Sequence, residues 1–184
     1  METTKRTTIT ATDPAFPDGI ELPWEPEPYS PVVIEDGVIR YLKHDEYGGD
    51  YEFPEGVRFI QGNHRHMYYE DDVEAWLEEV NEDPDLSVFP VGVYEHSAIQ
   101  YSLAGESIHS GDRWDYCVGA CIAIPNDFTD PKEAARAILK EYTAWCNGEV
   151  YLIVTVPIDN PDDYDVCGGF IGDYAEEALK SGDF

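Results

Sequence analysis

The stretch from residue 66 to residue 112 constrains the fold most strongly, because it holds twelve carboxylates and no lysine or arginine. Carboxylates that no nearby base neutralises have to face water. The first third of the stretch carries one apolar stripe at the i, i+3, i+4, i+7 spacing of a helix: Val73, Trp76, Leu77 and Val80. The sequence therefore predicts an amphipathic helix over about residues 70–81, ended by Asp83-Pro84-Asp85, with an acidic outer surface.

Short apolar runs separated by turn signals make up most of the remaining chain. They predict strands over residues 32–34, 38–42, 57–61, 91–95, 98–103, 116–124, 149–158 and 166–171. Asp36-Gly37 indicates a hairpin turn between the first two strands, and Gly168-Gly169 indicates a bulge in the last one. The expected fold class is α+β, with a mostly antiparallel sheet, two or three helices packed on it and a proline-rich N-terminal tail.

The clearest helix pattern covers residues 130–146. Asp130 can cap the first turn, Pro131 suits the first helical position, and Asn147-Gly148 ends the helix. A short helix is expected over residues 173–180. The apolar positions of the long helix predict a buried stripe that packs on the following strand, which carries Val150, Leu152 and Val154: Ala134, Ile138, Tyr142 and Trp145.

The N-terminal residues 1–30 differ in composition from the rest of the chain. They contain five prolines and no apolar periodicity, which predicts an extended or disordered tail. Residues 31–184 are expected to form a single acidic α+β domain, because a hydrophobic fraction of 42% is sufficient for a core. No segment resembles a signal peptide or a transmembrane helix, so a cytoplasmic location is expected.

The formal net charge of −28 restricts the possible partners. A field of this sign repels nucleic acids and anionic membranes and attracts basic proteins. We therefore expect no direct binding of nucleic acid or membrane. The expected partner-binding residues form one cluster around the acidic helix and a second after residue 158: Glu70, Asp71, Asp72, Glu74, Glu78, Glu79, Glu82 and Asp83, then Asp159, Asp162, Asp163 and Asp165.

Few residues offer catalytic or metal chemistry. His64 and His66, with Asp71 or Asp72 nearby, could approach a metal ion, but their spacing favours a structural role. Glu95-His96-Ser97 places a carboxylate, a base and a hydroxyl in sequence, yet neighbours on a strand point to opposite faces. The spacing of Cys117, Cys121, Cys146 and Cys167 does not suit a zinc site, so free thiols are expected. No catalytic residue, metal or cofactor is predicted.

Several short motifs resemble a group of small uncharacterised accessory proteins of bacteriophages and plasmids. The similarity covers roughly residues 57–173 and includes Tyr94-Glu95-His96-Ser97, Trp114-Asp115, Glu141-Tyr142, Asn147-Gly148-Glu149-Val150-Tyr151 and Cys167-Gly168-Gly169-Phe170. The group implies no activity and no catalytic residues; it implies a phage or mobile-element setting. The proline-rich start and the greater acidity of this chain depart from the pattern.

Two classes of function are compatible with these features. The leading hypothesis is a nucleic-acid mimic that is not an enzyme and inhibits a host defence system, as an anti-CRISPR or antirestriction protein, by occupying the basic cleft of a nuclease or CRISPR effector. The alternative is an accessory enzyme or metal-dependent protein that uses His64, His66, His96 and Cys117. The acidity could also be only a halophilic or solubility adaptation.

Overall fold

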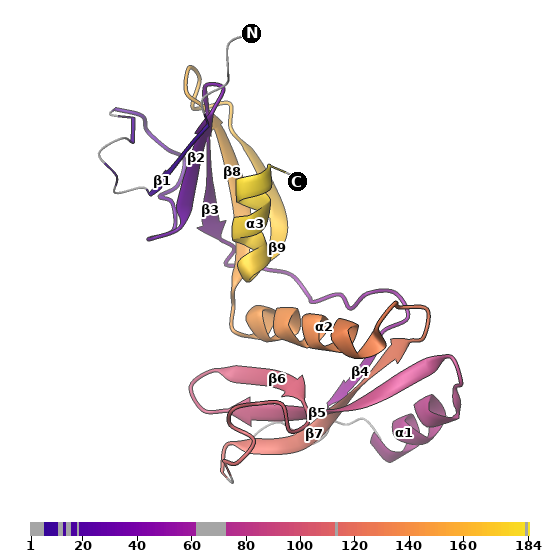
Figure 1. Ribbon diagram of the computed structural model, residues 1–184. Helices are drawn as coiled ribbons and strands as arrows, with labels where there is room; N and C mark the ends of the chain where they lie inside the picture. The colour runs from indigo at the N-terminus through magenta and orange to yellow at the C-terminus, as the bar shows by residue number, and fades with distance from the viewer. Residues whose placement is uncertain are drawn as a thin grey trace. The chain divides into compact units, whose positions relative to one another are not determined.

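The computed structural model describes residues 6–10, 13, 16–17, 19–61, 73–112, 114–182 and 184, with the backbone alone at residues 73–74 (Figure 1). The chain is α+β and forms two compact units. Unit 1 consists of Met1–Gly49 and Gly148–Phe184, and unit 2 consists of Asp50–Asn147. The sequence pattern predicts a single domain over residues 31–184 and does not indicate two units.

Unit 1 is built on a five-stranded antiparallel sheet in the order β1-β2-β3-β8-β9. Its strands are β1 (Thr7–Thr10), β2 (Pro31–Glu35), β3 (Val38–His44), β8 (Val150–Pro157) and β9 (Asp165–Ile171). The predicted turn between β2 and β3 is confirmed, since Asp36 and Gly37 have φ angles of 51° and 77°, as a two-residue hairpin turn requires. The predicted bulge is confirmed too, because Gly168 and Gly169 fall where the β8–β9 register shifts.

Both faces of the unit 1 sheet are covered. Alternating residues of the strands point to opposite faces, so Val33 and Leu42 pack on helix α3 (Asp173–Ser181), against Leu179 among others. On the other face, Val32, Ile39 and Tyr41 form a second core. Four residues within the expected tail pack there: Ile9, Phe16, Ile20 and Leu22.

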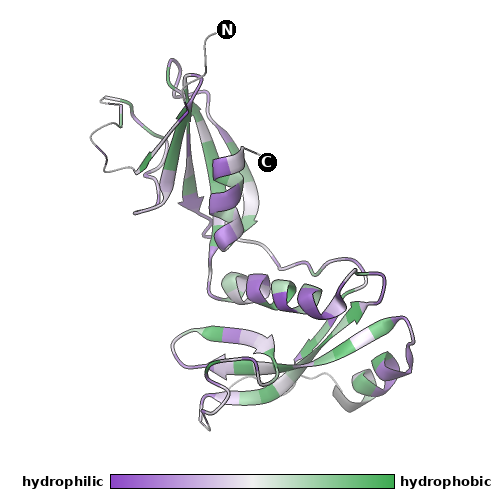
Figure 2. Ribbon diagram, in the orientation of Figure 1, coloured by the Kyte–Doolittle hydropathy of each residue, from purple (hydrophilic) through white to green (hydrophobic). Residues whose placement is uncertain are grey.

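Unit 2 contains a four-stranded antiparallel sheet in the order β4-β7-β5-β6. Its strands are β4 (Arg58–Gln61), β5 (Leu86–Glu95), β6 (Ile99–Leu103) and β7 (Tyr116–Pro125), and its helices are α1 (Val73–Glu82) and α2 (Pro131–Cys146). The predicted N-cap of α2 is confirmed, because the Asp130 carboxylate accepts hydrogen bonds from the backbone N–H groups of Lys132 and Glu133, both at 3.1 Å. Figure 2 shows the strands of both sheets as the most apolar segments.

The predicted packing of α2 on the following strand is wrong. Ala135, Ile138 and Leu139 are the buried residues of α2, and they pack on β5, β6 and β7, which precede it. Trp145 is only partly buried. Val150 and Val154 belong to β8 and hence to unit 1.

The two units are connected in an unusual order along the chain. Unit 1 is interrupted after β3 and resumes at β8, and these two strands are antiparallel neighbours, with His44 opposite Tyr151. Unit 2 is therefore inserted where a hairpin loop would otherwise join β3 to β8. Among the described residues, no helix has the length and apolar character needed to cross a membrane.

Candidate functional site

The acidic helix α1 presents the first predicted cluster. Glu78, Glu82 and Asp83 are exposed, and the Asp83 carboxylate accepts a hydrogen bond from the Asp85 N–H at 2.9 Å. Glu79 differs, because its carboxylate pairs with Arg58 at 2.9 Å. The predicted residues 70–72 and the side chain of Glu74 lie outside the described residues.

The second predicted cluster covers the turn after β8 and the first residue of β9. Asp159, Asp162, Asp163 and Asp165 are all exposed there. The Asp165 carboxylate accepts a hydrogen bond from the Val166 N–H at 2.9 Å. Because α1 belongs to unit 2 and this turn belongs to unit 1, each unit carries its own acidic cluster.

The negative charge is divided evenly. Unit 1 contains 19 acidic and 5 basic residues and unit 2 contains 20 and 6, so each unit has a formal charge of −14. Many of the basic residues are engaged in ion pairs with carboxylates of the chain: Arg6, Arg40, Lys43, Arg58, Lys132, Arg136 and Lys180. Among the described ion pairs, none reaches Glu78, Glu82, Asp83 or the cluster between β8 and β9.

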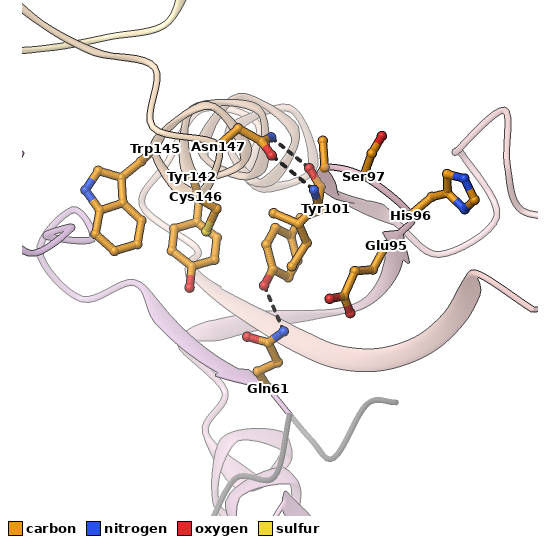
Figure 3. A pocket seen from close by; sticks show the side chains of 11 residues that line it. Gln61, Glu95, His96, Ser97, Tyr101, Tyr142, Trp145, Cys146 and Asn147 are labelled. Atoms are coloured by element: carbon orange, nitrogen blue, oxygen red, sulfur yellow. Dashed lines mark hydrogen bonds between the residues drawn. The ribbon is translucent and has the colours of Figure 1, made fainter. Parts of the chain in front are cut away.

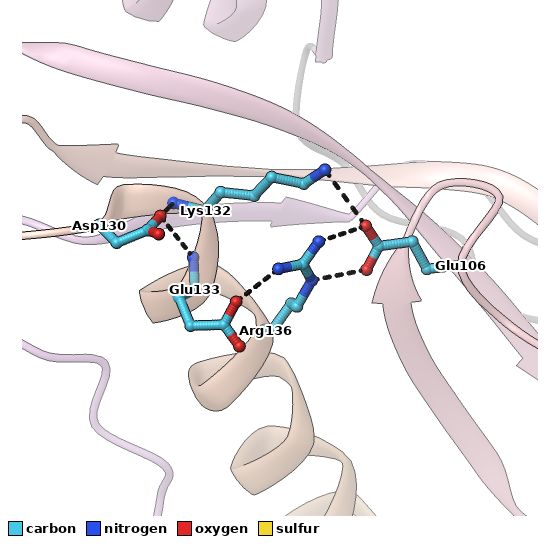
Figure 4. A network of polar contacts seen from close by, with 5 residues as sticks. All are labelled: Glu106, Asp130, Lys132, Glu133 and Arg136. Atoms are coloured by element: carbon cyan, nitrogen blue, oxygen red, sulfur yellow. Dashed lines mark hydrogen bonds and ion pairs between the residues drawn. The ribbon is translucent and has the colours of Figure 1, made fainter.

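A polar network at the start of α2 joins two basic and two acidic side chains (Figure 4). The Arg136 guanidinium donates two hydrogen bonds of 2.8 Å to the Glu106 carboxylate, and Lys132 lies 3.3 Å from it. These contacts, above all the one with Arg136, lower the pKa of Glu106 to about 2. Arg136 also pairs with Glu133. The network attaches the loop after β6 to α2 and is structural.

A cavity of about 520 Å³ lies within unit 2, where β5 ends, β6 begins and α2 ends (Figure 3). Gln61, the last residue of β4, contributes its side-chain amide and donates a 2.8 Å hydrogen bond to the Tyr101 hydroxyl. Asn147, just after α2, accepts a hydrogen bond from the Ile99 N–H at 3.0 Å and donates one to the Ile99 carbonyl at 2.8 Å. These bonds hold α2 and β6 together beside the cavity.

Three aromatic rings form one wall of this cavity. The ring centroids of Tyr101 and Tyr142 are 4.9 Å apart, and those of Tyr142 and Trp145 are 5.9 Å apart with nearly parallel planes. Figure 3 shows the three rings in a row beneath α2. Tyr142 and Trp145 are partly exposed, whereas Tyr101 is only 4% exposed, so Tyr142 and Trp145 provide most of the accessible aromatic area.

Glu95, His96 and Ser97 also line the cavity, but they do not converge as a catalytic triad. The His96 imidazole points away from the aromatic rings and its Nδ1 lies 3.0 Å from the Asp115 carboxylate. The Glu95 carboxylate is directed toward the side where Tyr101 and Gln61 lie (Figure 3). Among the described residues of the lining, Glu95 contributes a carboxylate near the aromatic rings.

The cysteines and histidines do not assemble a reactive centre among the described residues. All four cysteines are free thiols, and burial raises the pKa of Cys117, Cys121 and Cys146, which disfavours the nucleophilic thiolate. Within the described parts of the chain, no group of three or more His, Cys, Asp or Glu residues could hold a metal ion. His64 and His66 lie outside the described residues.

The cavity gathers residues that the sequence pattern had assigned to other roles. Glu95, His96, Ser97, Tyr142 and Asn147 come from sequence motifs that lie far apart along the chain, and all line this cavity. The sequence predicts Tyr142 and Trp145 in a buried stripe, whereas both are partly exposed and line the cavity. No protein-family model, curated protein or solved structure matches the chain.

Proposed function

We propose that this chain is an accessory protein of a bacteriophage or mobile element that inhibits a host defence system of the CRISPR or restriction type. In this proposal it occupies the basic DNA- or RNA-binding cleft of the effector and would act in the host-cell cytoplasm. The supporting observation is that exposed carboxylates stand on ordered elements while many of the basic residues are already paired within the chain.

The spacing of the acids on α1 suits such a role. Glu78 and Glu82 are one helical turn apart, about 6 Å along the axis at 1.5 Å per residue. Phosphates follow one strand of duplex DNA about every 3.4 Å. Carboxylates at this spacing would thus place negative charge in a basic cleft at somewhat lower density than DNA does.

Two alternatives lead to different expectations. A halophilic or solubility adaptation would also produce the even charge of −14 on each unit, and then only the total charge would matter. An accessory enzyme or metal-dependent protein would depend on His96 with its partner Asp115, together with His64, His66 and Cys117. Metal analysis of the purified chain tests the metal-dependent form, which requires a stoichiometric ion.

The proposal is tested by charge reversal at one place. Glu78, Glu82 and Asp85 are exposed acids at the end of α1 and just after it, and changing all three to Lys alters the net charge by six. Inhibition of DNA cleavage by a panel of restriction and CRISPR effectors is measured across a range of salt concentrations. We expect the parent protein to inhibit at least one effector, with a steep loss as salt rises, and the reversed variant to inhibit at least tenfold less.

A matched control keeps the total charge the same as in that variant. Glu52, Glu55 and Asp127 are also exposed acids of unit 2, outside α1, and are reversed to Lys together. This control should keep most of the inhibition. Equal losses in the two triple variants would mean that the charge acts only through its total, and an inactive parent protein across the panel would refute the proposal directly.

A further inference from the structure

We propose that an apolar rim of unit 1, formed by Trp24, Tyr164 and Val166, is a docking surface for an arginine-bearing segment of a basic partner protein. This inference goes beyond the proposed inhibition, because it names the side chain that the partner supplies and can be measured without any nuclease or CRISPR effector. It rests on the position of the rim at the end of a core, on the geometry of its two rings and on the carboxylates beside it.

The rim lies where the second core of unit 1 ends. A row of paired residues crosses this face of the sheet from Val32 through Tyr41 and Val154 to Val166. The first three are fully buried, whereas Val166, on the edge strand β9, is 36% exposed. The apolar face of the sheet therefore continues past the segments that cover it and reaches the open edge (Figure 1).

Two aromatic rings extend this surface. Tyr164 directly precedes β9 and lies two positions before Val166, the spacing that places side chains on one face of an extended segment. Its ring meets the ring of Trp24 edge to face, with centroids 5.3 Å apart and planes at 78°. Trp24 and Tyr164 are nevertheless 40% and 41% exposed. An edge-to-face pair covers only part of the ring surface, so the remainder is open to a partner.

Carboxylates flank Tyr164 in the chain. Asp162, Asp163 and Asp165 are exposed, and among the ion pairs of the described residues none involves these three. The four basic residues that the structure describes in unit 1 pair with other carboxylates: Arg6 and Arg40 with Glu35, Lys43 with Glu27, and Lys180 with Glu176. The described part of unit 1 therefore does not neutralise the charge beside the rim.

The charge determines which occupant fits. A second copy of the chain would bring the same carboxylates and a net charge of −28, which opposes the pairing of two copies. A basic protein is attracted by the same field. Arginine suits the rim better than lysine, because its planar guanidinium stacks on aromatic rings and forms paired hydrogen bonds with carboxylates. Tryptophan, tyrosine and arginine are also the residues that contribute most binding energy at protein interfaces.

The test titrates the full-length protein with the capped peptide acetyl-Ser-Arg-Ser-Arg-Ser-amide and with the same peptide carrying Lys in place of Arg. The salt concentration is about 150 mM, where screening over about 8 Å reduces non-specific attraction. Binding is followed by the NMR signals of the Trp24 indole and the Val166 amide. We expect saturable shifts at both positions and an affinity for the Arg peptide at least about threefold higher than for the Lys peptide. Equal affinity for the two peptides, or no shift at these positions, would overturn the proposal.

A pair of double variants tests the carboxylates. Asp162→Asn with Asp163→Asn removes two charges beside the rim, and Glu46→Gln with Glu177→Gln removes two exposed charges elsewhere in unit 1. We expect the first double variant to weaken binding of the Arg peptide at least about threefold and the second to change it less than about twofold. Equal effects would mean that the peptide senses only the total charge, which would also overturn the proposal.

A pair of tryptophan variants tests the rings. Trp24→Ala should lower the affinity for the Arg peptide at least about threefold, whereas Trp114→Ala, at a more exposed tryptophan of unit 2, should not. Similar effects of the two would exclude the rim. The peptide comparison and the acid variants leave the core intact, so they decide the question even where circular dichroism shows that Trp24→Ala unfolds. A dimer of the parent protein in sedimentation equilibrium that Trp24→Ala dissociates would replace the partner with a second copy and overturn the proposal.

Discussion

Truncation of Leu139 tests the packing of α2 on the sheet of unit 2. Leu139 is 1% exposed and belongs to the core formed with β5, β6 and β7. The Leu139→Ala variant loses three carbon atoms, which at about 0.8 kcal/mol each amounts to roughly 2.4 kcal/mol of transfer free energy. A residual cavity of about 40 Å³ adds about 1 kcal/mol. The free energy of unfolding should therefore fall by about 3–4 kcal/mol.

The assay is urea denaturation followed by tryptophan fluorescence. Trp76, Trp114 and Trp145 belong to unit 2, so the signal reports mainly on that unit. The midpoint should move to lower urea while the slope with denaturant stays the same. Lys140→Ala changes the next, exposed residue of the same helix and should cost less than about 1 kcal/mol. Similar losses in both variants would show that the assigned buried face of α2 is wrong.

Two further predictions concern single contacts. Arg136 is the main cause that lowers the pKa of Glu106 from 4.5 to about 2, so the ionised Glu106 stabilises the fold above pH 4.5 and this effect is lost as the pH falls toward 2. In the Arg136→Gln variant, NMR titration of the Glu106 carboxyl should give a higher pKa, and an unchanged pKa would contradict this cause. Gly92→Ala would place a Cβ 2.6 Å from Cζ of Tyr116, so urea denaturation should show a loss of about 1–3 kcal/mol, whereas Gly111→Ala, which meets no atom within 4 Å, should change stability little.

Local signals in the sequence were sufficient for most of the elements, but not for β1, which lies within the expected tail and pairs with β2. Asp36-Gly37 adopts the positive φ angles that its hairpin requires, and Asp130 caps α2 with its carboxylate. Both depend on residues only a few positions apart, so the sequence pattern contains all the information needed. The mostly antiparallel α+β class follows in the same way from short runs and tight turns.

Contacts between distant segments could not be predicted from the pattern. The apolar face of α2 is visible in the sequence, but the choice between β8 and the preceding sheet depends on strand pairing over long separations. The cavity could not be predicted for the same reason, because its lining residues Gln61, Glu95, Tyr101 and Trp145 come from four different elements. Only the pairing order β4-β7-β5-β6 together with α2 brings these elements together.

The insertion of unit 2 between β3 and β8 determines the order in which the chain can fold during synthesis. β3 can pair with β8 only after β8 has been synthesised, and the first residue of β8 is made roughly 100 residues after β3. Unit 2, in contrast, needs only its own continuous segment to fold. Since domains generally fold as units while the ribosome is still adding residues, unit 2 can finish first. Until β8 emerges, the hairpin of β2 and β3 has an unpaired β3 edge, which is prone to pair with other chains and to aggregate.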